Sequence, residues 1–540
     1  MKAAPKTTGL GYWMARVLEE CESVSVDFRA DPVHDLRVAL RRCRSMADGM
    51  MAMDPDREWK AMKKAGKELF QRLGALRDVQ IMMEWIGKLD VEKQGATPTP
   101  PISLSQAADI PQALHEEGVQ PEPAGSQRPS PATTLLQILK AREAEHKHEA
   151  RAALEEFDRK QWRQWSRSLP RRAARIRPGS AVFKHLALER WTAARELHTR
   201  AMRNRSQIAL HTLRIGIKRF RYIVENFLPV EHKAWSNDLK HMQDLLGEIH
   251  DLDVLWATAL GCRIFPDEAS RKAWHERIED ERSKRVAEYR GRTVGTGSLW
   301  EVWRAGLPQG KQIEEIATRR MKLWAKALDP DFAHSERVAR LAMELYDGLA
   351  ERGLFAVAKG SLKSSKNGAG SEARTSLYAA ALLHDVGKSK GNKGHHKESL
   401  QLIKAHGTPL GWKPETTARA AMVARFHCGA LPTRTHKTLR DLFPDEQKIV
   451  IRLAAILRLA NALDSGHDGQ IRKVKIENLV GERHRANGFL RKPQTLGKNE
   501  ALVIAAEGYA DGTRAAQAIA AERYLLETVL RRPIVVRAAS

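Results

Sequence analysis

The feature that most restricts how this chain can fold is an internal repeat of a basic segment. Residues 34–45 read HDLRVALRRCRS and residues 211–222 read HTLRIGIKRFRY, with five identical positions and four similar ones. A second pair follows in the same order, KELFQRLGALRDVQIM at 67–82 and KHMQDLLGEIHDLDVL at 240–255. Two copies of one ordered pair, rich in helix-forming residues, predict a duplicated helical unit.

Each copy of the basic segment places its cations along one face of a helix, because residues three or four positions apart lie above one another. This spacing is met by His34, Arg37, Arg41 and Arg44, and again by His211, Arg214, Lys218 and Arg221. An apolar stripe runs beside each basic stripe: Val33, Leu36, Leu40 and Cys43, and Leu210, Leu213, Ile217 and Phe220. We therefore expect each helix to pack by its apolar stripe and to present cations on the adjacent face.

A solvated basic face is the simplest interpretation of one such helix, but two observations favour an anion site. Like charges four residues apart destabilise a helix, and no acidic residue occupies a position of either stripe. The same unfavourable arrangement also occurs twice in register, so a duplicated unit can bring both stripes together around a pseudo-twofold axis. Four neighbouring cations complete the expected anion-binding set: Arg42, Lys67, Arg219 and Lys240.

Composition agrees with a polyanionic partner and with a folded, water-exposed chain. The 540 residues carry a formal net charge of +25, and 42% of them are hydrophobic. A charge so far from zero destabilises a compact state by self-repulsion, which a polyanion relieves, although charge alone does not distinguish nucleic acid, anionic lipid and polyphosphate. The four cysteines form no CxxC pair, and no signal peptide or apolar membrane-spanning run is apparent. These features predict a cytoplasmic protein without a membrane partner.

Residues 8–293 resemble a CHAD domain, the conserved histidine α-helical domain. The motifs VHDLRVALRRCRS, LGALRDVQ, LHTLRIGIKRFRY and LGEIHDLDV match its pattern in the expected order. The resemblance implies two four-helix bundles that face each other around a basic channel, which in this family binds inorganic polyphosphate. Residues 95–134 hold eight of the 23 prolines and are expected to be a disordered insertion that binding does not require.

The second half of the chain holds a set of histidines in contexts that suit metal binding. His334 opens an amphipathic helix, His384 and Asp385 follow the apolar run SLYAAALL, and His396 and His427 come later. Each histidine taken alone is more often structural or exposed, so the interpretation depends on the set. Neutral imidazoles with a carboxylate suit Mn, Fe, Zn or Ni.

This set resembles an HD domain, specifically the helical C-terminal module of exopolyphosphatase/guanosine-pentaphosphate phosphohydrolase proteins. The similarity spans residues 315–540, after a linker at 294–314, and rests on ALLHDVGK, GHHKESLQLI, RFHCGALP and ILRLANALDSGH. An α+β tail of three short strands and a helix also fits that subfamily. The actin-like domain that carries catalysis in those enzymes has no counterpart in this sequence.

The resemblance implies His334, His384, Asp385 and a late aspartate as metal ligands. Asn461 occupies the late position in RLANALD, and a neutral amide is a poor replacement for an anionic ligand. Asp464, about one turn further on, is the expected substitute. His396 and His427 are candidates for a second metal or for gripping phosphate. The expected catalytic residues are Asp385, His396 and His427.

The sequence thus predicts a mainly α protein with a duplicated CHAD-like unit, an HD-like unit and a small α+β appendage. We expect it to bind inorganic polyphosphate, with an HD-like module that is either a metal-dependent phosphohydrolase acting on phosphorylated small molecules or degenerate. Nucleic-acid binding is a weaker alternative, because aromatic residues make up only 6% of the chain and no motif interleaves them with the basic stripes. A non-catalytic scaffold on polyphosphate granules is the third.

Overall fold

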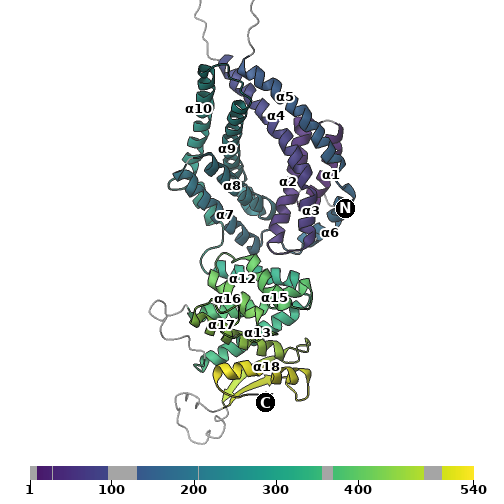
Figure 1. Cartoon of the computed structure of the whole chain (residues 1–540), viewed down its shortest axis with the longest axis vertical. Helices are drawn as coiled ribbons and strands as arrows, with labels where there is room; N and C mark the ends of the chain where they lie inside the picture. The colour runs from purple at the N-terminus through teal and green to yellow at the C-terminus, as the bar shows by residue number, and fades with distance from the viewer. Residues whose placement is uncertain are drawn as a thin grey trace, which may run out of the picture. The chain divides into compact units, whose positions relative to one another are not determined.

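The computed structural model describes residues 9–26, 28–94, 130–204, 206–354, 369–478 and 501–539. The chain divides into two compact units, the first holding Met1–Met50 and Arg57–Leu307 and the second Met51–Asp56 and Pro308–Ser540. Both units are predominantly helical, and a three-stranded sheet occurs near the C-terminus. The expected fold class, mainly α with a small α+β appendage, is confirmed (Figure 1).

The first unit contains both copies of the repeat. Its first half consists of α1 (Leu10–Val26), α2 (Ala30–Met51), α3 (Arg57–Ala65), α4 (Lys67–Gln94), α5 (Pro131–Glu155) and α6 (Arg159–Ala173). Its second half consists of α7 (Ala181–Arg203), α8 (Gln207–Phe227), α9 (Pro229–Gly261), α10 (Glu268–Thr293) and α11 (Leu299–Ala305). The duplicated segments fall on α2 and α8 and on α4 and α9, as equivalent helices of the two halves (Figure 1).

The apolar stripes of α2 and α8 explain why these helices form and how they are fixed. All eight stripe residues predicted to pack are at most 3% exposed. The two helices also contact each other directly, since Asn226 donates a hydrogen bond to Ser45 Oγ at 2.8 Å. Gly49 permits this approach, because a Cβ atom there would lie 2.3 Å from Cε2 of Phe227. The basic faces of the two repeats are therefore held in a fixed relation.

A second contact between the halves involves α4, α5, α9 and α10. Buried apolar side chains of these four helices form one cluster, which includes Trp85, Leu135, Leu255 and Ile278. Most of the proline-rich segment, residues 95–129, lies outside the described residues, and α5 already begins at Pro131. The two halves are thus joined both at α2 with α8 and at the helices that follow them.

The second unit packs its helices around one apolar core. They are α12 (Gln312–Leu328), α13 (Phe332–Glu351), α14 (Ala369–Leu383), the 3₁₀ turn η1 (Val386–Lys390), α15 (His395–His406), α16 (Pro414–Arg425), α17 (Pro444–Leu463) and α18 (Arg514–Leu530). Helix α14 and helix α17 are the most apolar of these, and their Leu and Ala side chains lie in the core. The histidines of interest lie on α13, directly after α14, at the start of α15 and in the turn after α16.

The appendage forms a small mixed sheet in the order β1-β2-β3. Strand β1 (Lys473–Asn478) pairs antiparallel with β2 (Leu502–Glu507), and β2 pairs parallel with β3 (Ile534–Ala538). Helix α18 makes the crossover between the two parallel strands, as a parallel connection requires. The three strands and the helix predicted for the tail are confirmed.

Candidate functional site

Two arginines of the first basic stripe are anchored by their own repeat. Arg37 Nη1 donates to the carbonyl oxygen of Phe70 at 3.2 Å, and Arg44 Nη1 donates to that of Lys63 at 2.7 Å. Both guanidinium groups also lie over the Phe70 ring, 4.9 and 5.2 Å from its centroid. These contacts hold both side chains against α3 and α4 rather than leaving them free in solvent.

Cations of the two repeats meet in what we call the central cation cluster: Arg37, Arg41, Arg214 and Lys218. Burial, followed by the charges of Arg214, Arg41 and Arg37, lowers the pKa of Lys218 to about 7. Arg41 of the first repeat also lies over the ring of Tyr222 of the second, at 5.6 Å. The Nε atoms of Arg41 and Arg214 are buried without a hydrogen-bond partner among the residues that the structure describes. The cluster therefore has unmet capacity to bind anions.

Two equivalent aspartates border the cluster. Asp78 on α4 and Asp251 on α9 occupy matching positions of the repeat, and each interacts with Arg214 and Lys218. Burial raises the pKa of Asp251 to about 6, although Arg214 opposes this effect. Burial of the carboxyl group likewise raises the pKa of Asp78, although Arg37 and Arg214 oppose this effect. Two carboxylates do not balance the cations around them, so a positive excess remains.

The other expected anion-binding residues differ in how available they are. Arg42 is engaged by Glu225 and lies over the ring of Trp13 at 5.0 Å, and Arg221 also approaches Glu225, at 3.6 Å. These contacts assign Arg42 to the packing of α2 on α8. The remaining three cations are exposed and lie on α4, α8 and α9: Lys67, Arg219 and Lys240.

The histidines that head the two stripes differ in their neighbours. His211 Nδ1 lies 3.2 Å from Nδ1 of His250, whereas His34 is exposed near Arg77. Burial and nearby cations lower the pKa of both His34 and His211. Burial and Arg214 lower the pKa of His250 further, to about 4. In the free protein these imidazoles are thus disfavoured as cations.

The candidate metal centre of the second unit is built around Asp385, which follows α14. Its side chain is 3% exposed, and its two oxygens face different groups of histidines. One group comprises His334 on α13, His384 and Asp385, and the other comprises His395, His427 and Cys428. Within each group the candidate ligand atoms all lie within 4.8 Å of one another. Asp385 thus lies where the two groups meet.

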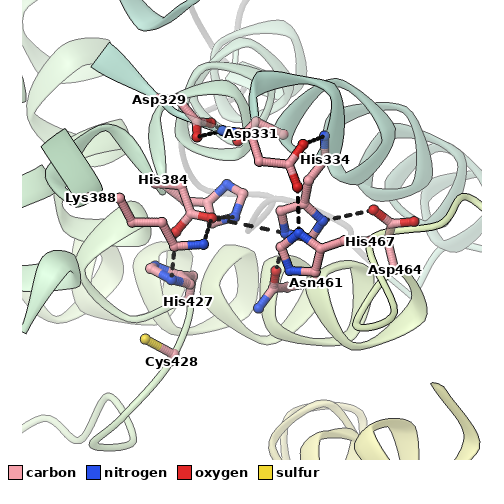
Figure 2. Close-up of polar contacts among 12 residues, drawn as sticks. Asp329, Asp331, His334, His384, Lys388, His427, Cys428, Asn461, Asp464 and His467 are labelled. Atoms are coloured by element: carbon pink, nitrogen blue, oxygen red, sulfur yellow. Dashed lines mark hydrogen bonds and ion pairs between the residues drawn. The ribbon is translucent and has the colours of Figure 1, made fainter. Parts of the chain in front are cut away.

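The Oδ2 atom of Asp385 faces the first group. It lies 3.3 Å from His384 Nε2, 4.0 Å from His334 Nε2 and 2.6 Å from the ammonium of Lys388. His384 Nε2 is buried and has no hydrogen-bond partner among the described residues. Figure 2 shows Asn461, Asp464 and His467 around His334 on one side, with Lys388, His384 and His427 on the other.

The Oδ1 atom of Asp385 faces the second group, at 3.3 Å from His395 Nε2 and 3.6 Å from His427 Nε2. The two Nε2 atoms are 3.0 Å apart, and Cys428 Sγ lies 3.8 Å from that of His395. Oδ1 is buried and has no hydrogen bond of acceptable geometry to any residue that the structure describes. Unsatisfied buried polar atoms are rare in proteins and often mark a site for an ion.

Hydrogen bonds at Nδ1 determine which nitrogen of each histidine is free to bind a ligand. His384, His395 and His427 donate from Nδ1 to backbone carbonyls three residues earlier, at 2.7, 2.8 and 2.8 Å. His334 donates from Nδ1 to Asp464 Oδ2 at 2.7 Å. Such second contacts are typical of metal-binding histidines, because they fix the tautomer and direct the Nε2 lone pair. The residues present therefore fit a divalent transition metal.

The ionisation of the centre follows from its charges. Burial opposes the ionised form of Asp385, but His384 and the other histidines around it hold its pKa well below the ordinary range. Hydrogen bonds to Asp385 and Cys428 raise the pKa of His395 to about 10. Burial and the neighbouring His384 lower the pKa of His427. The cluster is an anionic carboxylate surrounded by imidazoles that compete for one positive charge.

The structure places Asp464 differently from the ligand position that we expected. It follows the last residue of α17, where the chain turns, so its carboxylate accepts from Nδ1 of His334 and from Arg337 Nε at 3.0 Å. Although burial opposes ionisation, these bonds lower the pKa of Asp464. Asp464 thus orients the His334 ring through Nδ1 and leaves Nε2 to face the candidate metal centre. Asn461 Oδ1, 3.0 Å from His334 Nε2, lies on the side where a metal would bind.

The structure brings His395, rather than its neighbour His396, against Asp385. His396 lies near Gly429, and burial and Arg425 lower its pKa to about 4. Sequence reasoning also omitted Cys428 and Lys388, both in direct contact with the cluster. Cys428 directly follows a candidate ligand, and that adjacency was the signal that could have identified it.

In comparisons with known proteins, two family models match separate parts of the chain. The family model described as CHAD domain matches residues 14–260, and the model described as Ppx/GppA phosphatase, domain III, matches residues 316–506. Among solved structures, the CHAD domain from the plant Ricinus communis is similar at 19% identity and a TM-score of 0.32, covering 55% of this chain and 88% of that one. The comparison with curated proteins found no match.

Among the described residues, no helix has the length and apolar character needed to cross a bilayer. The two family matches follow each other without overlap and together account for most of the chain. The first contains the central cation cluster, and the second contains the histidines around Asp385. The N-terminal part of the chain thus matches the CHAD domain model, and the C-terminal part matches the model of Ppx/GppA phosphatase, domain III.

Proposed function

We propose that the CHAD domain binds inorganic polyphosphate through the central cation cluster. The observation that carries this proposal is the meeting of cations from both repeats with too few carboxylates to balance them. Burial, and after it the repulsion of the neighbouring arginines, lowers the pKa of Lys218 to about 7. A flexible polymer with one negative charge per phosphate relieves that repulsion at every residue of the cluster.

Polyphosphate fits this cluster better than nucleic acid does. Single-stranded nucleic acids are gripped by aromatic rings on which bases stack, in addition to cations along the backbone. The aromatic rings beside the cluster, Phe70 and Tyr222, are covered by the guanidinium groups of Arg37, Arg44 and Arg41. They are therefore already stacked by protein cations, which favours a ligand recognised through phosphate alone.

The test compares two variants of the full chain that lose the same charge. The first replaces Arg37, Arg41, Arg214 and Lys218 with Gln, and the matched control replaces Lys160, Arg163, Arg167 and Arg171, which are exposed on α6. We expect the first variant to bind polyphosphate much more weakly while retaining helicity, and the control to bind as the wild type does. Equal binding by both variants would refute the proposal, and tighter binding of an RNA of equal charge would support the nucleic-acid alternative.

We further propose that the second domain is a metal-dependent phosphohydrolase. His334, His384 and Asp385 would hold the metal, and Lys388 lies beside Asp385 where it can balance the charge of a substrate phosphate. A bound divalent metal supplies a Lewis acid and lowers the pKa of water. The chain contributes the oriented Nε2 atoms and the buried carboxylate of Asp385, whose lowered pKa keeps it ionised and able to bind a cation.

Metal analysis and phosphate release from polyphosphate and phosphate esters test this second proposal. We expect the full chain to bind a divalent transition metal, with Mn, Fe, Zn and Ni compared, and to release phosphate in an Asp385-dependent manner. Metal binding that survives Asp385→Ala would overturn the assignment of the centre. Metal or polyphosphate binding without any hydrolysis would support the non-catalytic scaffold instead.

A further inference from the structure

We propose that Arg425, together with His396 and the N-terminal turn of α15, binds a phosphoryl group beside the candidate metal centre. Arg425 is the last residue of α16, and His396 is the second residue of α15. The inference rests on the proposed phosphohydrolase function for the identity of the anion, but the residues that form the site require no metal. It also gives a role to His396, which the structure does not bring against Asp385.

Arg425 is a buried cation without a carboxylate partner among the residues that the structure describes. It is 6% exposed, and its Nη1 atom is buried and has no hydrogen-bond partner there. Its guanidinium group lies over the Phe426 ring, 5.4 Å from the centroid. Burial lowers the pKa of Arg425, and the neighbouring group that opposes this effect is the thiol of Cys428 rather than a carboxylate. Because a buried charge is costly unless it is paired, an anion that binds beside Arg425 is stabilised by it.

Two other buried arginines of the same domain show how the fold normally pairs such a residue. Arg419 is 5% exposed and donates to Glu446 from Nε and Nη2, at 3.1 and 2.8 Å. Arg458 is also 5% exposed and donates to Glu522 at 2.7 Å and to two backbone carbonyls of the turn after α16, at 3.1 and 3.2 Å. Arg425 is buried to the same degree without such a glutamate in the described part of the chain. An anion from solution would therefore neutralise it.

The groups around His396 add to this positive charge. Four side chains influence the charge of its ring, and all are cations when protonated: Arg425, His395, Lys397 and Arg458. His395 and Arg458 each contact a carboxylate, at 3.3 and 2.7 Å. Arg425 and Lys397 contact none within the ranges that the structure describes, so a positive excess remains beside His396.

The N-terminus of α15 contributes backbone donors to the same place. This helix has 12 residues and begins after Gly394, whose φ is 76° and which has no side chain to cap the first turn. The positive end of the helix dipole and the first amide groups favour an anion there. A Cβ atom at residue 429 would lie 3.3 Å from Nε2 of His396, so Gly429 leaves that nitrogen uncrowded. A guanidinium group, an imidazole and helix amides together suit the oxygens of a phosphoryl group.

The site lies next to the metal centre rather than within it. Arg425 precedes His427 by two residues, and the ring centroids of His396 and His427 are 6.4 Å apart. His427 faces Oδ1 of Asp385, whereas Lys388 contacts Oδ2. Arg425 thus anchors a phosphoryl group on the Oδ1 side, away from the position where Lys388 balances charge.

Alkylation of Cys428 by iodoacetamide, followed by mass spectrometry of the full chain, reports on this site separately from the CHAD domain. Cys428 is half-buried and lies three residues after Arg425. With a chelator present, and with chloride at equal ionic strength as the reference, inorganic phosphate should slow the alkylation several-fold in the wild type. Arg425→Met should abolish this protection. The matched control, Arg440→Met, removes an exposed arginine from the segment between α16 and α17 and should keep it.

Glycerol phosphate, tested in the same way, identifies the source of the anion. Protection by inorganic phosphate alone assigns the site to free phosphate, and protection by both compounds assigns it to the phosphate group of an ester.

Thermal unfolding without phosphate separates a binding role from a structural one. Arg425→Met should leave the melting temperature unchanged or raise it, because it removes an unpaired buried charge, whereas Arg419→Met should lower it by leaving Glu446 unpaired. Phosphate that does not protect wild-type Cys428, equal protection in folded Arg425→Met, or a loss of stability in Arg425→Met as large as that in Arg419→Met would each overturn the proposal. A failure of metal binding or hydrolysis would not, because the alkylation is measured with a chelator present.

Discussion

At the level of single residues, the two candidate sites differ in the sign of the charge that their side chains leave unbalanced. In the CHAD domain, Lys218 lies among arginines, and the excess positive charge is left for a ligand to balance. Around Asp385 a buried carboxylate faces several imidazoles. Its Oδ1 atom and Nε2 of His384 have lone pairs without a hydrogen-bond donor among the described residues, and a cation can bind to them. The first arrangement suits an anionic polymer and the second suits a metal ion.

Lys218 should make polyphosphate binding depend on pH near neutrality. In the free protein its pKa is about 7, and bound phosphate favours the protonated form, so binding takes up a proton above that pH. Affinity should therefore fall as pH rises above 7, by up to about tenfold per pH unit. Titration calorimetry between pH 6 and 9 measures this effect.

The matched control for this prediction is Lys218→Arg, which keeps the charge at every pH tested. Its affinity should change little above pH 7. Protonation of His34 and His211 strengthens binding only at lower pH, because burial and neighbouring cations lower the pKa of both. An equally steep decline in Lys218→Arg would show that another group is responsible.

Asn461 should limit metal affinity at the centre formed by His334, His384 and Asp385. Its Oδ1 lies 3.0 Å from His334 Nε2, so Asn461→Asp places a carboxylate oxygen where an anionic ligand can join His334. We expect the affinity for a divalent transition metal to increase about tenfold or more, as measured by chelator competition. Asp464→Asn should have the opposite effect, because Asp464 orients His334 through Nδ1. Unchanged affinity in Asn461→Asp would exclude a role for this position.

At the scale of helices, two equivalent glycines differ in how closely an arginine of the cation cluster approaches them. Gly74 on α4 and Gly247 on α9 occupy matching positions of the repeat. A Cβ atom at Gly74 would lie 2.6 Å from Nη1 of Arg37, whereas one at Gly247 would lie 4.0 Å from Nε of Arg214. The first glycine leaves no room for a side chain beside its arginine, and the second does.

Gly74→Ala should therefore weaken polyphosphate binding without destabilising the fold. Alanine stabilises a helix interior by roughly 1 kcal/mol relative to glycine, and the side chain that must move is the flexible end of Arg37. Moving it breaks the bond from Arg37 to the carbonyl of Phe70 and misplaces the guanidinium. Gly247→Ala should bind normally and gain similar stability. Thermal unfolding and polyphosphate titration of both variants check this, and equal binding would contradict it.

The sequence predicted the helices well because their apolar stripes are long and regular. Both stripes of α2 and α8 are buried as expected, and the three strands of the tail form where the sequence predicts them, with the central strand β2 buried along almost all its length. Side-chain placement at helix ends was less predictable. Asp464 lies one residue beyond α17, where the chain leaves the helix and its carboxylate reaches His334 Nδ1.

The choice between His395 and His396 shows the same limit. Two adjacent histidines are equivalent in a sequence pattern, and only the start of α15 decides which one faces Asp385. Gly394, in a left-handed conformation with φ of 76°, precedes the helix and directs His395 toward Asp385. Helix periodicity does not determine this geometry, because it depends on a single turn.

At the scale of the whole molecule, a large positive charge coexists with a specific cluster. The chain carries a formal charge of +25, much of it exposed, as on α6. The cluster, by contrast, requires residues of both repeats, since Arg37 and Arg41 come from α2 and Arg214 and Lys218 from α8. General attraction and specific binding can therefore be separated by experiment.

Salt dependence separates them, because each cation that pairs with a phosphate releases a condensed counterion. Six basic stripe residues predict a slope of log affinity against log salt of about −4, by analogy with single-stranded nucleic acids. The variant that lacks Arg37, Arg41, Arg214 and Lys218 should retain a slope of only about −1.4 from the remaining two. The four-residue control on α6 loses the same charge from the same +25 but should keep the slope of about −4. Polyphosphate titrations from low to moderate salt measure all three, and similar slopes for the two variants would mean that net charge, rather than the cluster, binds the polymer.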